Sequence, residues 1–308
     1  MIPVVSIIMA TYNRAHYIVE TLQSIQNQNF TDWECLIIDD GGTDNTLDII
    51  QPILENDKRF QYFIRTDKHK KGLPGCRNYG LDLAKGNYVI FFDDDDIVHP
   101  QNLTVSTSHI EKNNVDFCHY AKSPFTTIYP DFIYHTDAYV REIGINDIKD
   151  IIIQKIGFAS CTVLWKKDCF NNNHFNESLH YAEEWECYCR LMTNNLRGIM
   201  IDTILYFNRK HPNSNTGEFY ANDPLRRKSY VEAVLLVVKN LKQKGLLTYS
   251  LKRYFIGISI KFKEYNLFKN LIDTLEFTTF EKLKWQLFYF VLPLRLKATK
   301  IKKAFKNN

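Results

Sequence analysis

Short apolar runs and longer amphipathic segments alternate through the first 120 residues of the chain. Ile18, Leu22 and Ile25 recur at helical spacing between two runs that are typical of buried strands. This order is that of a β–α–β unit, and it predicts an α/β fold with a mostly parallel sheet. The predicted strands are residues 4–9, 35–38, 60–64, 88–92 and 116–120, and helices are expected to begin near residues 46, 76 and 100.

The pattern weakens between residues 122 and 160, where prolines and aromatic residues indicate loops and irregular strands. A further helix is predicted over residues 182–193. Beyond residue 225 the apolar spacing indicates lysine-rich amphipathic helices. We therefore predict a catalytic domain over residues 1–224, followed by a basic helical extension over residues 225–308.

Charge divides the chain at the same point. Residues 225–308 contain 19 Lys/Arg and 5 Asp/Glu, whereas residues 1–224 contain 20 Lys/Arg and 30 Asp/Glu. The two parts are therefore expected to face different partners. Nucleic acid is not among the expected partners, because the first part is acidic and no recognised nucleic-acid module is present.

The seven cysteines are scattered and form no Cys-x-x-Cys pair, so we expect buried reduced thiols rather than disulfides or a zinc site. The N-terminal segment lacks a basic leader and is interpreted as a first core strand. The longest C-terminal apolar run, residues 287–294, is too short to span a bilayer. These features predict a cytoplasmic protein that is soluble or peripherally attached to the inner face of the cell membrane.

Four consecutive carboxylates, Asp93 to Asp96, follow the predicted strand at residues 88–92. Like charges at the carboxyl end of a buried strand repel one another, and a divalent cation with oxygen ligands would offset the repulsion. The carboxyl ends of the strands are also where open α/β sheets bind ligands. The alternative is a solvated acidic turn before the helix near Pro100.

Two neighbouring strand ends carry further candidate groups. Tyr12 follows the first strand and Asp40 follows the second, so a ring that can stack on a base lies beside a carboxylate that can accept its N–H. We interpret the pair as a nucleobase site, although a packed loop aromatic and a turn-forming aspartate are the alternatives. Arg77, after a glycine turn, suits diphosphate or base oxygens, or alternatively a surface salt bridge.

Five stretches, in this order, resemble the inverting family-two glycosyltransferases: residues 5–14, 37–46, 72–80, 91–96 and 181–186. The resemblance covers residues 3 to 215. It implies the GT-A fold, a Rossmann-like and mostly parallel central sheet flanked by helices, here with a C-terminal helical extension. It further implies transfer of a sugar from a UDP-sugar donor to an acceptor hydroxyl with inversion, in a setting such as bacterial surface polysaccharide biosynthesis.

The resemblance also assigns residues. Those placed at the nucleotide sugar are Thr11, Tyr12, Arg14, Asp40, Arg77, Asp93 and Asp94. The family's Asp-x-Asp motif falls on Asp93 and Asp95, which would hold Mn²⁺ or Mg²⁺, with Asp95 as the direct ligand. His211 resembles a histidine that approaches the diphosphate or the metal in the family's closing loop. A lone histidine is otherwise an ordinary surface or core residue.

Glu183 and Glu184 occupy the family's Glu-Asp-Trp position, at the start of a predicted helix. Glu184 is the candidate general base that would take a proton from the acceptor hydroxyl. The family usually has Asp there, and the extra methylene moves the carboxylate, so Glu183 is the second candidate. An ordinary acidic first turn of a helix is the structural alternative.

The sequence leaves other functions and partners open. A nucleotidyltransferase would also use paired aspartates, but residues 10–16 do not supply its usual glycine-rich phosphate loop. A non-catalytic nucleotide-sugar or glycan-binding module is a further alternative. A glycan or lipid-linked molecule is the expected acceptor. The basic C-terminal helices are expected either to contact anionic lipid headgroups or to pack on the catalytic domain or a partner subunit.

Overall fold

The computed structural model describes residues 2–133, 139–211 and 215–304, and it describes side chains as far as residue 291. The chain forms two compact units, residues 1–233 and 234–308. The boundary between them falls inside one helix, α8, which begins where the sequence predicted the C-terminal extension.

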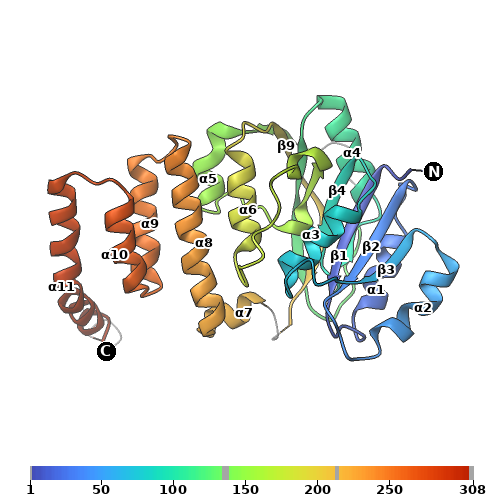
Figure 1. Cartoon of the computed structure of the whole chain (residues 1–308), viewed down its shortest axis with the longest axis horizontal. Coiled ribbons are helices and arrows are strands. Elements are labelled where there is room, and N and C mark those ends of the chain that lie inside the picture. The colour runs from blue at the N-terminus through green and yellow to red at the C-terminus, as the bar shows by residue number, and fades with distance from the viewer. Residues whose placement is uncertain (1, 134–138, 212–214, 305–308) are drawn as a thin grey trace. The chain divides into compact units, whose positions relative to one another are not determined.

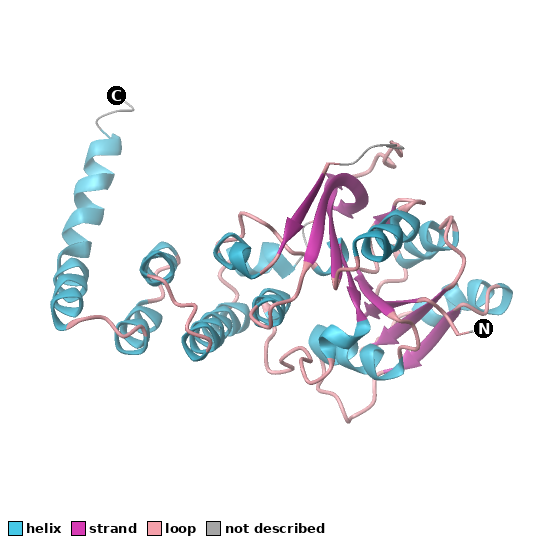
Figure 2. Cartoon of the chain, turned by 90° about the horizontal axis from the view of Figure 1, so that it is seen from above, coloured by secondary structure: helices cyan, strands magenta, loops and turns pink. Residues whose placement is uncertain are grey.

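The first unit is built on a nine-stranded sheet flanked by helices (Figures 1 and 2). Its strands are β1 (Val5–Thr11), β2 (Trp33–Asp39), β3 (Phe60–Ile64), β4 (Tyr88–Phe92), β5 (Ile97–Val98), β6 (Phe117–Phe125), β7 (Val140–Ile143), β8 (Val163–Lys166) and β9 (Gly198–Arg209). The five predicted strands are confirmed, and the fifth continues as far as Phe125. Burial of successive residues on β1 and β2 explains why both read as continuous apolar runs.

The helices of the first unit are α1 (Ile18–Gln26), α2 (Thr46–Asn56), α3 (Leu73–Leu83), α4 (Asn102–Asn113), α5 (Ile148–Ile152), α6 (Glu183–Met192) and α7 (Asn215–Tyr220). Short 3₁₀ turns lie at Ile145–Asp147, Ser160–Thr162 and Lys167–Phe170. The predicted helices are confirmed to within a few residues. The irregular region predicted over residues 122–160 contains β7 and α5, and its residues 134–138 lie outside the described part of the chain.

The strand order is β3-β2-β1-β4-β8-β6-β9-β5, with β7 paired to β9. The pairs among β1 to β4 are parallel, and so is β6 with β9, whereas the pairs made by β8, β5 and β7 are antiparallel. The chain moves outward from β1 to β3 and then returns to place β4 on the other side of β1. This reversal creates a topological switch point between β1 and β4, where α/β sheets bind their ligands.

Helix α3 lies unusually close to β1. A Cβ atom added at Gly80 would clash with the side chain of Ile8, so glycine is required for this approach. This packing holds α3 on the sheet, and the Arg77 guanidinium lies 5.9 Å from the centroid of the Phe91 ring near the end of β4.

The C-terminal helices are α8 (Pro224–Gln243), α9 (Tyr249–Lys261), α10 (Tyr265–Thr274) and α11 (Thr279–Ala304), which confirms the predicted helical extension. Leu251, Phe255, Phe268 and Leu271 are among the buried apolar side chains of the second unit. Among the described residues, no helix combines the length and apolar character needed to cross a bilayer. All seven cysteines are buried and unpaired, as predicted.

Candidate active site

The first two strands end side by side. The backbone N–H of Asp40 donates a hydrogen bond to the Thr11 carbonyl at 3.0 Å. Thr11 is buried, whereas the Tyr12 ring next to it is half-exposed, with the Lys71 ammonium 4.9 Å from its centroid. Tyr12 and Asp40 therefore follow neighbouring strand ends, as the sequence predicted, and Tyr12 is 47% exposed.

The Asp40 carboxylate is held by two donors. Arg65 Nε donates to it at 2.6 Å, and the backbone N–H of Gly72 donates to it at 2.9 Å. Gly72 has a φ of 124°, which favours glycine and directs its N–H to the carboxylate. Sequence reasoning missed Arg65, because nothing in the apolar strand that it follows marks it as a partner of Asp40.

The acidic loop, Asp93 to Asp96, joins β4 to β5, and β5 pairs with the end of β9. Asp94 and Asp95 are buried, whereas the Asp93 side chain is partly exposed. Arg14 Nε lies 3.4 Å from Asp94 Oδ1, and an Arg14 terminal nitrogen lies 3.9 Å from Asp95 Oδ2. The predicted residue Arg14 thus gives the loop a cation, but at distances longer than a close ion pair.

Burial and then the neighbouring Asp95 charge raise the pKa of Asp94 to about 7, against the attraction of Arg14. Burial, Asp93 and Asp95 likewise raise the pKa of Asp96 well above its usual value. Each carboxylate makes its neighbours harder to ionise. The loop therefore has more negative charge than its protein partners balance, and an added cation would be stabilising there.

His211 contacts the acidic loop. It follows β9, and its Nε2 is 2.9 Å from Asp95 Oδ2. Two ligands at right angles on a metal with bonds of about 2.1 Å are separated by about 3 Å, so the Asp95–His211 spacing fits neighbouring ligands of one Mg²⁺- or Mn²⁺-sized ion. The donor set of carboxylate oxygens and one imidazole also suits Mn²⁺.

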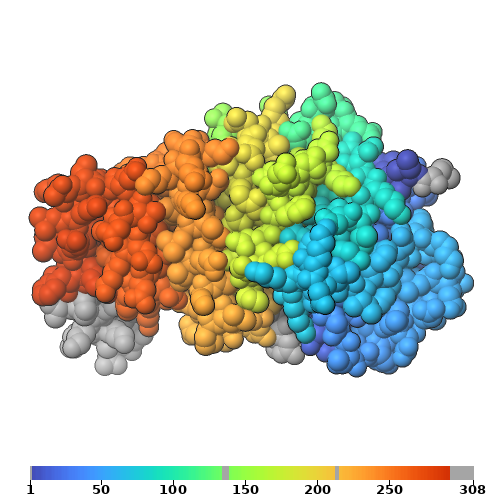
Figure 3. Space-filling view, in the orientation of Figure 1, coloured from blue at the N-terminus to red at the C-terminus, as the bar shows by residue number. Residues whose placement is uncertain are grey.

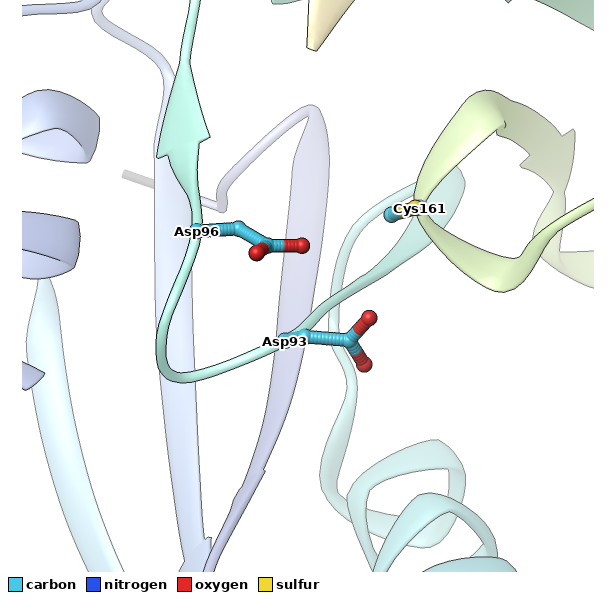
Figure 4. Close-up of side chains that lie close together, drawn as sticks. All are labelled: Asp93, Asp96 and Cys161. Atoms are coloured by element: carbon cyan, nitrogen blue, oxygen red, sulfur yellow. The ribbon is translucent and has the colours of Figure 1, made fainter. Parts of the chain in front are cut away.

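The acidic loop contributes to a second group of possible ligands. The side chains of Asp93, Asp96 and Cys161 have ligand atoms within 4.8 Å of one another (Figure 4). Burial raises the pKa of the Cys161 thiol, which keeps it protonated, and a thiol is a poor ligand for Mg²⁺ or Mn²⁺. The Asp96 carboxylate already accepts the backbone N–H of Arg209 at 2.7 Å. Asp95 with His211 is therefore the better cation site.

The two candidate bases, Glu183 and Glu184, lie in the first turn of α6. Glu183 is nearly buried, with 9% of its side chain exposed, and it pairs with an Arg77 terminal nitrogen at 3.1 Å. The Glu184 side chain is 32% exposed, and its Oε2 accepts the backbone N–H of Ser160 at 3.0 Å. Of the two carboxylates, Glu184 is the one that is both oriented by the protein and open to a substrate.

Arg77 lies between the acidic loop and the two glutamates of α6. Its guanidinium is buried, donates to Ser160 Oγ at 2.9 Å, and has a nitrogen 3.8 Å from both Asp93 and Glu184. Nearby carboxylates raise its pKa despite burial, so it stays charged. The direct nucleotide contact expected of Arg77 stays a prediction; the structure buries the guanidinium and points it toward these carboxylates.

Lys122, on β6, was missed by sequence reasoning. Burial lowers its pKa, but the negative charges of Glu184 and Asp93 contribute to a net rise, so the ammonium is favoured. Its Nζ lies 3.9 Å from the Cys161 sulfur. The only sequence signal is a lysine inside an apolar strand, which is too common to single out a site residue.

The segment before α6 is tied to the region around α3 by Glu177. Its carboxylate accepts hydrogen bonds from Asn78 at 2.8 Å and from the Lys70 backbone at 2.7 Å, and it contacts His69 Nδ1 at 2.7 Å. Figure 3 shows the yellow-green atoms of this segment against the blue-to-cyan atoms of the region before and within α3. These contacts hold the approach to Glu184 in place.

Comparison of the sequence with known proteins identifies similar glycosyltransferases. Residues 6–154 match Glycosyl transferase family 2. An uncharacterized glycosyltransferase of Rickettsia bellii is 29% identical over 63% of this chain, and the match covers 27% of that relative. The GalNAc(5)-diNAcBac-PP-undecaprenol beta-1,3-glucosyltransferase of Campylobacter jejuni is 40% identical over 30% of each protein. The chain thus spans less than a third of the length of either relative.

Solved structures agree in fold. S. aureus TarS, residues 1–349 in complex with UDP-GlcNAc, has a TM-score of 0.69 at 20% identity and covers 88% of this chain and 80% of its own. The mannosyltransferase PcManGT of Pyrobaculum calidifontis, in complex with GDP-Man and Mn²⁺, has a TM-score of 0.53 at 14% identity and covers 89% of this chain and 86% of its own. The match of residues 6–154 to glycosyl transferase family 2 thus agrees with the GT-A fold of the N-terminal unit.

Proposed function

We propose that this protein transfers a sugar from a UDP-sugar to an acceptor hydroxyl with inversion of the anomeric centre, and that it requires a divalent cation. One observation carries the proposal: buried Arg77 lies 3.8 Å from Asp93 at the cation end and 3.8 Å from Glu184 at the base end. A single network therefore joins the two functions that the reaction needs.

The donor would bind across the ends of β1, β2 and β4. Tyr12 would stack on the uracil ring, and Asp40, already fixed by Arg65, would accept its N–H. Thr11 shapes the floor of this site, while Arg14 and Asp94 face the ribose and diphosphate region. UDP as the nucleotide is supported by the UDP-GlcNAc bound to TarS, which has the same fold.

Asp95 and His211 would hold Mn²⁺ or Mg²⁺, and Asp93 is a further candidate ligand. The bound ion supplies positive charge that stabilises the nucleoside diphosphate as it leaves. The protein's own part is to orient these ligands through fixed neighbours. The Asp95 carbonyl accepts Arg209 Nε at 2.8 Å, and the Asp93 backbone N–H donates to the Tyr206 hydroxyl at 3.1 Å.

Glu184 is the proposed general base. At the start of α6, it is more exposed than Glu183, and its carboxylate is oriented by the Ser160 N–H. Glu183 instead neutralises Arg77 inside the protein. Arg77 is therefore a positioning residue, which sets where Glu184 and Asp93 stand relative to each other.

The acceptor is proposed to be a lipid-linked glycan in polysaccharide assembly at the inner face of the bacterial membrane. The support is the name of the Campylobacter jejuni relative, which specifies an undecaprenol diphosphate-linked acceptor. A partly exposed carboxylate such as that of Glu184 is suited to take a proton from a neutral sugar hydroxyl, which is the attacking group.

The proposal is tested by measuring UDP release from a panel of UDP-sugars, with Mn²⁺ or with EDTA, and with a polyprenyl diphosphate-linked sugar as acceptor. We expect one donor to give acceptor-dependent UDP release that EDTA abolishes and that produces an inverted linkage by NMR. Retention of configuration, or full activity in EDTA, would contradict the proposed mechanism.

A further inference from the structure

One face of α11 exposes four large apolar side chains. Phe280, Leu283, Leu287 and Phe290 are between 54% and 80% exposed. Their spacing of three, four and three residues places them on one side of the helix, so they form a continuous strip that we call the apolar stripe. Single exposed apolar residues need no explanation, but an aligned set of this size marks an interaction surface.

The apolar stripe is not what attaches α11 to its own unit. The opposite side of the helix does so: Tyr289 stacks on Phe268 of α10 with ring centroids 4.7 Å apart, and Trp285 lies 6.3 Å from Phe277. Helix α11 is therefore already anchored through one side, and the stripe is a second apolar surface on the same helix.

The charge around the stripe is strongly positive. Within residues 279–308 the sequence has eight Lys/Arg and a single acidic residue, Glu281. Lys282 and Lys284 lie within the same turns as the stripe, and Lys284 is exposed. The remaining six basic residues follow it in the sequence: Arg295, Lys297, Lys300, Lys302, Lys303 and Lys306.

We propose that the apolar stripe of α11 docks on an anionic lipid surface, with the stripe in the acyl boundary and the lysines at the headgroups. Apolar side chains along one face of a basic helix are what such a surface binds. A second copy of the chain is disfavoured as the occupant, because pairing the stripes would bring two equally basic helices together. This docking extends the proposed function, since a lipid-linked acceptor lies at the membrane, but it can be measured without any catalysis.

The experiment is co-sedimentation of the full chain with phosphatidylcholine vesicles, with or without about a third of phosphatidylglycerol. We expect binding only to the anionic vesicles, weakened at high salt because exposed charges are then screened. The double variant Leu283→Glu, Leu287→Glu should bind about tenfold or more weakly. Both positions are exposed, so the fold should be retained.

A matched control makes the same change in charge and chemistry elsewhere. Leu47 and Ile49 are also exposed apolar residues, but on α2 of the first unit. The variant Leu47→Glu, Ile49→Glu should bind anionic vesicles like the wild type. Phe280→Ser with Phe290→Ser provides a second stripe variant that introduces no charge, and it too should lose binding.

Three outcomes would overturn the proposal. Unchanged vesicle binding by both stripe variants would show that the stripe does not contact the lipid. Unchanged binding together with loss of a dimer in light scattering would identify a second copy as the occupant. Equal binding to neutral and anionic vesicles would remove the role of charge. UDP release in the absence of vesicles should be the same for all variants, so failure of docking is distinguishable from failure of the proposed function.

Discussion

The carboxylates at the start of α6 and those after β4 are balanced by different kinds of group. Glu183 and Glu184 have a buried arginine and a backbone N–H at 3.0 to 3.1 Å. Asp94 and Asp95 have the more distant Arg14, at 3.4 and 3.9 Å, and a histidine. The pKa of Asp94 accordingly rises to about 7 through burial and the charge of Asp95.

The difference indicates what each end needs in order to work. At the proposed base, Glu184, the protein orients the carboxylate before any substrate arrives. The cation end has an excess of negative charge that a divalent ion would neutralise. A base must be pre-positioned to be effective, whereas a cation can arrive with the diphosphate that it binds. The following predictions test this contrast, from the largest effect to the smallest.

The largest effect is expected for Glu184→Gln. The amide keeps the shape but cannot take a proton, so kcat should fall by about 10³-fold while the KM for the donor changes little. Steady-state UDP release measures both constants. Glu183→Gln is the matched control, because it removes the neighbouring charge. If Glu183→Gln caused the larger loss of kcat with no loss of stability, the assignment of the base would be reversed.

Arg77→Met should mainly affect stability. Removing one partner of a buried charge network leaves Glu183 uncompensated, which costs about 3 to 5 kcal/mol of unfolding free energy. Urea denaturation followed by circular dichroism measures the loss. The double variant Arg77→Met, Glu183→Met should be less destabilised than the two single changes added together. Additive effects would mean that the two side chains are not energetically coupled.

His211→Ala is expected to raise the Mn²⁺ concentration for half-maximal activity by about 10- to 100-fold, as losses at metal sites commonly do. The imidazole contacts Asp95 at 2.9 Å, so its removal affects the cation end alone. His174→Ala, at an exposed histidine, is the control and should leave the Mn²⁺ dependence unchanged. A fall in kcat at saturating Mn²⁺ with no change in the Mn²⁺ requirement would place His211 elsewhere in the mechanism.

The smallest effect, on stability, is expected for Glu177, whose contacts tie the segment before α6 to α3. Burial opposes ionisation of Glu177, but hydrogen bonds from Asn78, His69 and Lys70 outweigh it and lower its pKa. A depressed folded-state pKa contributes stability above the unfolded value of 4.5, and this stability is lost as the pH falls through the folded-state pKa. Glu177→Gln should therefore cost about 1 to 2 kcal/mol at neutral pH and less in acid.

Thermal unfolding of the wild type and Glu177→Gln between pH 7 and about pH 3 measures this prediction. Glu55→Gln, at an exposed position of α2, should change stability by less than about 0.5 kcal/mol at any pH. A pH-independent difference between wild type and Glu177→Gln would show that the charge of Glu177 does not contribute.

The sequence predicted the strands around the candidate site well, because strand ends and acidic motifs are local features. Residues 60–64 and 88–92 are strands with the predicted bounds, and Tyr12 and Asp40 follow neighbouring strand ends as expected. What it could not predict is the direction in which a side chain points. Arg77 follows a glycine turn in a manner typical of a nucleotide contact, yet the close packing of α3 on β1 leaves it buried among carboxylates.

Contacts between residues that are distant in the sequence could not be predicted either. Arg65 and Lys122 join the site only because β3 and β6 place them there, and neither belongs to a recognisable motif. The choice between Glu183 and Glu184 also depends on burial, which adjacent positions in one helical turn do not reveal in sequence. The sequence pattern thus predicted which residues form the candidate site. The packing of the fold determines which of them are buried and which additional residues lie beside them.

The central claim is that the loop after β4 binds a cation that in turn binds the UDP diphosphate. It is tested most directly by thermal unfolding with UDP, with and without Mn²⁺, for the wild type and Asp95→Ala. Ligand binding stabilises the folded state by mass action, so UDP should raise the wild-type melting temperature only when Mn²⁺ is present, and Asp95→Ala should lose that increase. Equal stabilisation by UDP without Mn²⁺, or an unchanged Mn²⁺-dependent increase in Asp95→Ala, would contradict the claim.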